Sequence, residues 1–262
     1  MTLKLSICEA TDKGPRAQNQ DAVRVVTPAP LLAASKGHLL AVADGVSHCQ
    51  DGGLAANATL QALALDYYST PETWTIPHAL DKLLTAHNRW LRVNGGGQPL
   101  LTTLTALGLR GERYTLAHIG DCRAYLLRDG KLRNLTSEHV WEQPGMEHVL
   151  KRALGLDEHL LMDYIEGELR AHDQLLIVSD GVWASLKDSE IHGILHEQPF
   201  EQACPVLLER TYRAGSQDNA SALLVRVDAL PESSLSGALA PLDERALPPQ
   251  LKTDQPFEGW EV

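Results

Sequence analysis

Two acidic residues stand at the ends of two nearly identical stretches of the chain. Residues 39–46 read LLAVADGV and residues 175–182 read LLIVSDGV, so both follow the pattern L-L-x-V-x-D-G-V. A short apolar run of this kind is typical of a strand that is buried on both faces, and the Asp-Gly pair ends it. Each stretch therefore brings one carboxylate, Asp44 or Asp180, to the edge of a sheet, followed by a glycine that lets the backbone approach a ligand closely.

Three further aspartates stand beside predicted strand ends. Asp21 opens a strand, Asp121 closes one, and Asp218 precedes the last one. A single aspartate next to a turn is most often a turn former, and that interpretation stays open for each of these residues taken alone. Five carboxylates gathered at one end of a fold would repel one another unless cations were bound, and hard oxygen ligands suit Mg²⁺ or Mn²⁺. The sequence therefore predicts a divalent-metal site.

The charge balance of the chain bears on whether it binds nucleic acid. The 262 residues include 34 Asp and Glu against 23 Lys and Arg, a formal net charge of −11. This surplus argues against a nucleic-acid-binding protein, because affinity for the phosphate backbone comes from clustered Lys and Arg. With 44% hydrophobic and 22% charged residues, the composition is that of a globular protein.

Other features indicate the cellular compartment. No run approaches the ~18 apolar residues that a membrane span needs, and the first residues lack the basic and apolar regions of a signal peptide. Four cysteines, Cys8, Cys49, Cys122 and Cys204, are scattered without a CxxC pair, which favours reduced thiols. We expect a cytoplasmic protein that neither enters a membrane nor binds nucleic acid.

The elements that must position the aspartates can be read from the hydrophobic periodicity. Helices come in pairs and strands in meanders, which predicts an α+β fold with antiparallel sheets rather than alternating βαβ units. The predicted helices are Gly52–Tyr68, Pro77–Asn94 and Ser189–Ala214, the last broken near Pro199; predicted strands besides residues 39–43 are Ala22–Val26, Leu101–Leu109, Tyr114–Ile119, Ala124–Arg128, Lys131–Leu135, Leu160–Leu169, Gln174–Ser179 and Ala220–Val227.

Seven short motifs, in a fixed order, make the chain similar to a known family. From about residue 5 to residue 227 it resembles the bacterial PPM-type metal-dependent protein phosphatases, also called the protein phosphatase 2C family. The motifs are RAQNQD at 16–21, VADG at 42–45, TTL at 102–104, IGDCRAY at 119–125, RALG at 152–155, VSDG at 178–181 and GSQDN at 215–219. The resemblance implies a four-layer sandwich of two antiparallel β-sheets flanked by helix pairs, with two Mg²⁺ or Mn²⁺ ions in a cleft at one end.

The resemblance also implies roles for single residues. By position in the motifs, Asp44 would bridge both metal ions, and the carbonyl of Gly45 would bind one of them. Asp180 and Asp218 match the aspartates on the other ion. Asp21 matches an acidic position that acts indirectly or through water.

Two more residues complete this set. Asp121 matches the aspartate that helps to hold a third, weaker ion in bacterial relatives. Arg16 matches the arginine that binds the substrate phosphate, a role suited to a guanidinium, which grips two phosphate oxygens in a fixed fork. A metal pair activates water for in-line attack on phosphorus, so no covalent nucleophile is required.

The chain departs from the family pattern in two places. After Asp44, relatives usually carry a histidine that here stands one place early, as His48; it is either a general acid for the leaving alkoxide or a bystander. The flap between His139 and Arg152 has only twelve residues, and its Trp141 and Met146 either contact a partner or cover the cleft.

The composition changes after residue 228. We expect a phosphatase domain at 1–228 and a proline-rich acidic linker or tail at 229–262. The final residues, 256–262, resemble the start of a bacterial Ser/Thr kinase domain, so a kinase could follow in a longer polypeptide.

The leading hypothesis is a Mg²⁺- or Mn²⁺-dependent phosphatase of phosphoserine and phosphothreonine in proteins, acting as a monomer beside a cognate kinase. Two alternatives stay open. One is a pseudophosphatase that binds phosphoproteins, because of the irregular segment after Asp44, and the other is a small-molecule phosphatase, because of the short flap.

Overall fold

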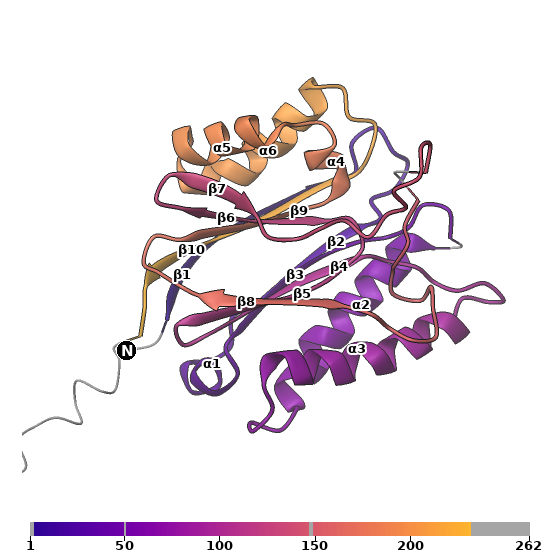
Figure 1. Ribbon diagram of the computed structural model, residues 1–262, viewed down its shortest axis with the longest axis horizontal. Helices are drawn as coiled ribbons and strands as arrows, with labels where there is room; N and C mark the ends of the chain where they lie inside the picture. Colours follow the sequence, from indigo (N-terminus) through magenta and orange to yellow (C-terminus); the bar gives the residue numbers. More distant parts are fainter. Residues whose placement is uncertain (1–2, 50, 147–148, 232–262) are drawn as a thin grey trace, which may run out of the picture. The chain divides into compact units, whose positions relative to one another are not determined.

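Two five-stranded antiparallel sheets face one another in the computed structural model, which describes residues 3–49, 51–146 and 149–231 (Figure 1). The first sheet has the order β1-β10-β9-β6-β7: β1 (Lys4–Asp12), β10 (Ala220–Ala229), β9 (Gln174–Val178), β6 (Arg123–Arg128) and β7 (Lys131–Asn134). The second has the order β2-β3-β4-β5-β8: β2 (Asp21–Val26), β3 (His38–Asp44), β4 (Leu104–Arg110), β5 (Arg113–Ile119) and β8 (Asp163–Glu168).

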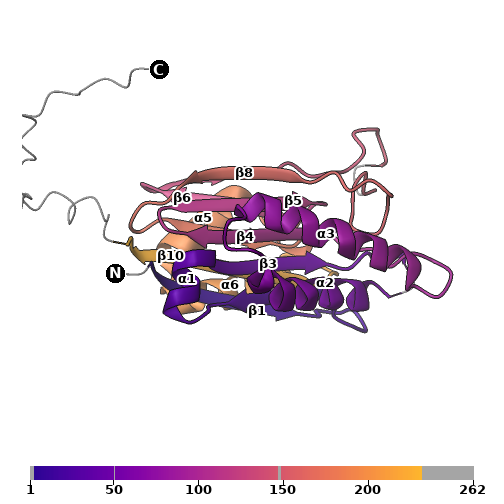
Figure 2. The same cartoon turned by 90° about the horizontal axis from the view of Figure 1, so that it is seen from below.

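Helices cover the outer face of each sheet. Helices α2 (Gly52–Asp66) and α3 (Ile76–Val93) lie over the second sheet, with the short α1 (Pro30–Lys36) beside them (Figure 2). Helices α5 (Asp188–Glu197) and α6 (Phe200–Arg213) lie over the first sheet. A 3₁₀ turn (Tyr67–Ser69) extends α2, and the one-turn helix α4 (Asp180–Trp183) follows β9. The expected four-layer α+β sandwich, including the helix break near Pro199, is confirmed.

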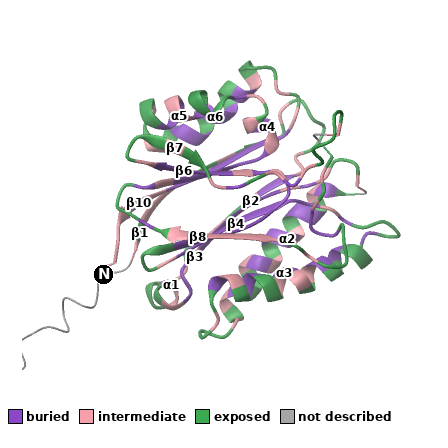
Figure 3. Cartoon of the chain, in the orientation of Figure 1, coloured by how far each residue is buried: buried purple, intermediate pink, exposed green. Residues whose placement is uncertain are grey.

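The core explains why the strands are apolar without interruption. In β3, Leu39, Ala41 and Ala43 pack against the helices, whereas Leu40 and Val42 pack against the first sheet. Figure 3 shows the resulting buried layers along both sheets. Fully burying an aliphatic side chain contributes ~1.5–3 kcal/mol, so the strand that ends in Asp44 is anchored from both sides.

The structure differs in several helices and strands from those predicted from the sequence. Strand β4 begins at Leu104 rather than Leu101, because Thr102 forms isolated bridges with Gly45 and Leu154 instead of joining the strand. The prediction omitted β1, α1 and α4. Strand β1 escaped notice because it is an edge strand whose side chains are mostly half-buried or exposed.

The end of the folded part lies close to the predicted boundary. Strand β10 continues two residues past the predicted Val227, to Ala229, which pairs with Lys4. The boundary at residue 228 stays a prediction, and residues 232–262, with the tail and the kinase-like ending, lie outside the described residues. Among the helices that the structure describes, none is long and apolar enough to cross a membrane.

Candidate metal and phosphate site

The structure brings all five predicted aspartates to the same end of the two sheets. Asp44 ends β3 and pairs in register with Asp21, which begins β2. Asp180 directly follows β9, and Asp218 precedes β10, the strand beside β9. Asp121 lies in the turn between β5 and β6. Residues that are up to 197 positions apart in the sequence therefore form one acidic cluster.

The carboxyl groups of this cluster resist ionisation. Burial raises the pKa of Asp21 to about 6 and that of Asp121 to about 7, and the charge of Asp180 adds to both shifts. Burial also raises the pKa of Asp44 well above its usual range, with further increases from the charges of Asp21, Asp180 and Asp121. Like charges in a partly desolvated site need a cation or a proton to offset them.

The donor atoms fit a hard divalent cation. The Oδ1 atom of Asp121 is buried and has no hydrogen-bond partner in the described part of the chain. Possible ligand atoms of Asp44, Asp121 and Cys122 lie within 4.8 Å of one another. Burial raises the pKa of the Cys122 thiol well above its usual range, and sulfur suits softer metal ions than Mg²⁺ or Mn²⁺. The carboxylate oxygens remain, which are the ligands that Mg²⁺ and Mn²⁺ prefer.

A glycine is required directly after Asp44. A Cβ atom on Gly45 would lie 2.1 Å from the carbonyl oxygen of Gly52 at the start of α2 and 2.8 Å from that of Gln20. No other residue type fits without moving the backbone, so Gly45 allows α2 and the loop before β2 to close around the acidic cluster. Its carbonyl remains the predicted ligand atom.

Two threonines hold the main chain of Asp44 in place. The carbonyl oxygen of Asp44 accepts from the Thr103 amide at 2.8 Å and from the Thr102 hydroxyl at 2.9 Å. The Asp44 amide donates to the Thr103 hydroxyl at 3.0 Å. The Thr-Thr pair belongs to one of the sequence motifs, but its role could not be predicted, because the contact joins residues that are almost 60 positions apart.

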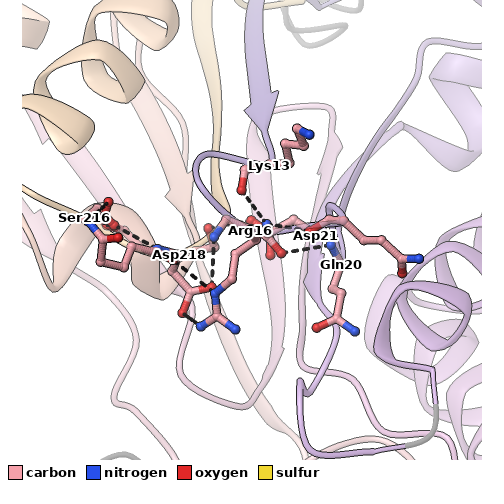
Figure 4. Close-up of polar contacts among 11 residues, drawn as sticks. Lys13, Arg16, Gln20, Asp21, Ser216 and Asp218 are labelled. Atoms are coloured by element: carbon pink, nitrogen blue, oxygen red, sulfur yellow. Dashed lines mark hydrogen bonds and ion pairs between the residues drawn. The ribbon is translucent and has the colours of Figure 1, made fainter.

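Arg16 lies at the acidic cluster but is already paired there. Its Nη2 atom donates to Oδ2 of Asp218 at 2.8 Å, and its Nε atom donates to the Gln217 carbonyl oxygen at 3.0 Å. Figure 4 shows the guanidinium turned toward Asp218. The side chain is 43% exposed, so the other N–H groups face toward solvent and are accessible to an anion.

Asn219, which had no predicted role, positions the loop that carries Arg16. Its Nδ2 atom donates to the carbonyl oxygens of Lys13 and Gln18, both at 2.9 Å. Its Oδ1 atom accepts from the Gln20 amide at 2.9 Å. One buried side chain thus fixes both ends of the Arg16 loop beside Asp218. The sequence signal that could have indicated this role is the Asp-Asn pair at 218–219, which follows Gly215 and precedes the last strand.

The histidines near the site differ in their surroundings. His48 is exposed in the turn after Gly45, and no hydrogen bond or ion pair joins it to the described aspartates. His139 is buried, and its Nδ1 atom accepts from the Gly120 amide at 3.2 Å. Its Nε2 atom therefore carries the proton and donates to Asp163 Oδ2 at 3.1 Å. His139, which had no predicted role, supports the turn that holds Asp121.

The short flap forms a narrow hairpin where it is described. Val140 and Leu150 form a bridge, and the Trp141 amide donates to the Val149 carbonyl oxygen at 3.0 Å. The Trp141 side chain is partly exposed, with Lys151 Nζ 5.5 Å from its ring centroid. The roles of Trp141 and Met146 stay open.

Comparison with known proteins identifies the relatives of this chain. Residues 15–225 match the family described as Protein phosphatase 2C. The "Serine/threonine protein phosphatase PstP" of Mycobacterium tuberculosis is 30% identical over 247 residues, which cover 87% of this chain and 46% of the relative. The "Serine/threonine phosphatase stp" of Listeria monocytogenes is 26% identical over 217 residues, or 72% of this chain and 84% of the relative. The chain thus spans about half the length of the mycobacterial relative.

Solved structures agree with the sequence matches. The catalytic domain of PstP in complex with two manganese ions aligns with a TM-score of 0.73 and 30% identity, covering 87% of this chain and all of that domain. PppA of Pseudomonas aeruginosa, described as a key regulatory component of the T6SS, aligns with a TM-score of 0.73 and 26% identity, covering 86% of this chain and 98% of PppA.

Removing one carboxyl group from the acidic cluster is expected to stabilise the metal-free protein. Asp44→Asn relieves repulsion within the acidic cluster. The melting temperature of this variant in EDTA should therefore lie above that of the wild type. An increase of 1 kcal/mol in the free energy of unfolding corresponds to about 2–4 °C for a domain of this size. Asp157→Asn, at an exposed site, is the control and should change little. Differential scanning calorimetry measures both. A lower melting temperature for Asp44→Asn would contradict a repulsive cluster.

Stability of the metal-free protein should fall as pH rises. The folded-state pKa values of Asp21 and Asp121, about 6 and about 7, exceed the ~3.9 of an unfolded chain. Their contribution to stability is therefore full below about pH 4 and is lost as pH rises through about 7. Urea unfolding in EDTA at several pH values should show this loss, and Asp121→Asn should reduce it. A variant that loses stability as steeply as the wild type would argue against the raised pKa of Asp121.

Proposed function

Because the chain belongs to the protein phosphatase 2C family, we propose that it is a metal-dependent phosphatase of phosphoserine and phosphothreonine residues in proteins. The observation that carries this proposal is the acidic cluster at one end of the sandwich, with Arg16 at its rim. The cluster contains a buried carboxylate oxygen on Asp121 that has no hydrogen-bond partner among the described residues. A protein that used these carboxylates only as turn formers would leave them exposed to water.

The proposed metal ligands follow from the positions of the aspartates. Asp44 and the Gly45 carbonyl would hold one Mn²⁺ or Mg²⁺ ion, and Asp44, Asp180 and Asp218 would hold a second. Asp121, together with Asp180, would hold a third, weaker ion, and Asp21 would act indirectly. When bound, such cations lower the pKa of a water and neutralise charge on the phosphoryl oxygens.

Asp21 supports the proposed metal ligands through a contact with the first sheet. It is buried, and its Oδ2 atom accepts from the Ser179 hydroxyl at 2.8 Å. The Ser179 hydroxyl oxygen also accepts from the Ser221 amide at 2.9 Å, so Asp21 is tied to the end of β9 and the start of β10, two neighbouring strands of the first sheet. Asp21 also pairs in register with Asp44 where β2 begins and β3 ends.

Arg16 would bind the phosphate group of the substrate. A guanidinium has five N–H donors, and Arg16 uses two of them on the carbonyl oxygen of Gln217 and the carboxylate of Asp218. Three donors remain for phosphate oxygens. The exposed His48 would supply a proton to the leaving alkoxide from a ring nitrogen.

A protein substrate is supported by an open groove that the loop carrying Arg16 helps to form, although its lining includes neither Arg16 nor the five aspartates. A shallow groove of about 690 Å³ runs between the loop before β2 and the start of α2. Its lining mixes charged, polar and apolar groups, namely Thr11, Asp12, Lys13, Ala17, Gln18, Asn19, Asp51, Gly53, Leu54 and Asn57. An open groove of this kind accommodates an extended polypeptide better than it encloses a small metabolite.

We also propose the cytoplasm as the site of action and a Ser/Thr kinase as the functional partner, with the phosphatase acting in signalling as a monomer. All four cysteines are free in the structure, which suits a reducing compartment. A kinase in the same polypeptide would appear as a native species well above 28.6 kDa on an immunoblot.

The activity is tested with purified protein and Mn²⁺ or Mg²⁺. Phosphoserine and phosphothreonine peptides should be hydrolysed, and EDTA should abolish turnover. Asp180→Asn should reduce the rate more than about 100-fold, since losing a group that only supports a ligand already costs about 10–100-fold.

The same assay separates the alternatives. Well-folded protein without metal-dependent turnover on peptides or para-nitrophenyl phosphate would point to a pseudophosphatase. Faster hydrolysis of sugar or nucleotide phosphates than of phosphopeptides would point to a small-molecule phosphatase.

Arg16 and His48 should give different kinetic signatures. Arg16→Ala should lower kcat/KM about 10–100-fold on all phosphate monoesters, because charge-assisted hydrogen bonds contribute ~1.5–3 kcal/mol each; Arg16→Lys should recover part of this loss. His48→Ala should lower kcat on an alkyl phosphate, where proton donation contributes about 10²–10⁴-fold. It should spare para-nitrophenyl phosphate, whose leaving group needs no proton. An unchanged kcat on the alkyl ester would show that His48 is not the acid.

A further inference from the structure

We propose that Trp183 is a positioning residue that holds Asp121 beside Asp180, and so sets the affinity of the third, weaker cation. Trp183 ends α4, the one-turn helix that Asp180 begins. Its indole Nε1 atom donates to the main-chain carbonyl oxygen of Asp121 at 2.9 Å. One hydrogen bond therefore ties the turn that carries Asp121 to the helix that carries Asp180. The inference rests on the metal site proposed above.

The main chain of Asp121 needs such a support. Asp121 follows Gly120, whose φ of +112° is a left-handed conformation, and a Cβ atom on Gly120 would lie 2.4 Å from Cβ of Thr103. The Oδ1 atom of the Asp121 carboxylate is buried, and no group in residues 3–49, 51–146 or 149–231 forms a hydrogen bond with it. Two hydrogen bonds to the neighbouring main chain therefore determine where this oxygen lies. The Gly120 amide donates to His139, and the Trp183 indole donates to the Asp121 carbonyl oxygen.

The indole ring is itself held by a cation. The guanidinium carbon of Arg123 lies 4.0 Å from the centroid of the Trp183 ring, within the range of a cation–π interaction. Arg123 also pairs with Glu138, and with Asp188 at 3.7 Å. Since Arg123 is two residues after Asp121, the segment 121–123 contacts the face of the indole ring through Arg123 and accepts its hydrogen bond through Asp121.

Repulsion between Asp121 and Asp180 is the reason why the hydrogen bond from Trp183 should affect cation binding. Asp180 contributes the largest charge effect on the raised pKa of Asp121, after burial itself. Without the indole hydrogen bond, the turn is free to relax away from α4 and widen the gap between the two carboxylates. The ligands proposed for the other two ions include Asp44, which the Thr102 and Thr103 contacts hold independently.

The test compares Trp183→Phe with the wild type. Phenylalanine keeps an aromatic face for Arg123 but lacks the N–H group. Isothermal titration calorimetry with Mn²⁺ should show the two tighter sites unchanged and the weakest site weakened about 5–10-fold, the equivalent of one lost hydrogen bond. The Mn²⁺ concentration for half-maximal activity should rise, and kcat at saturating Mn²⁺ should recover. Trp90→Phe, at a partly exposed position on α3, is the matched control and should bind all ions as the wild type does.

A double-mutant cycle gives an independent readout. In an Asp121→Asn background, Trp183→Phe should have no further effect on Mn²⁺ binding, and a further effect there would overturn the proposal. Unchanged binding at the weakest site in Trp183→Phe would also overturn it, and so would equal weakening of all sites with a lowered melting temperature. A wild type that binds two ions but no third overturns the role of Trp183 alone, whereas a wild type that binds none overturns the proposed function as well.

Discussion

Mutual repulsion among five carboxylates, gathered where two sheets end, is the constraint on which the site depends. Strands β3 and β9 are apolar on both faces and lead directly to Asp44 and Asp180, and Asp21, Asp121 and Asp218 lie at the ends of other strands or in a turn nearby. Burial and the neighbouring charges raise the pKa values of Asp44, Asp121 and Asp180. A divalent cation offsets this repulsion better than protons do near neutral pH, and so the arrangement favours metal binding.

The surrounding structure resists the repulsion with neutral contacts. Thr102 and Thr103 hold the main chain of Asp44, Asn219 holds the Arg16 loop, and Trp183 holds the turn of Asp121. These hydrogen bonds hold the main chain of Asp44, the main chain of Asp121 and the Arg16 loop without adding charge. The site is therefore preformed in its backbone, while the carboxylates themselves keep free lone pairs for ligands.

Much of the fold and of the candidate site could be predicted from the sequence. The repeated L-L-x-V-x-D-G-V stretches predicted two buried strands and two of the carboxylates, because strand periodicity and the Asp-Gly ending are local signals. Strand β1 was missed, since a half-exposed edge strand has no uninterrupted apolar run. The contacts of Asn219 and Trp183 join residues 62 to 206 positions apart, and no local pattern encodes such pairs.

The most direct test of the account is anomalous diffraction at the manganese edge from crystals of the wild-type protein grown with MnCl₂. We expect peaks among the carboxylates of Asp44, Asp180 and Asp218, with a weaker peak beside Asp121 that disappears in Asp121→Asn. Crystals in which the acidic cluster holds no ion at saturating Mn²⁺ would contradict it.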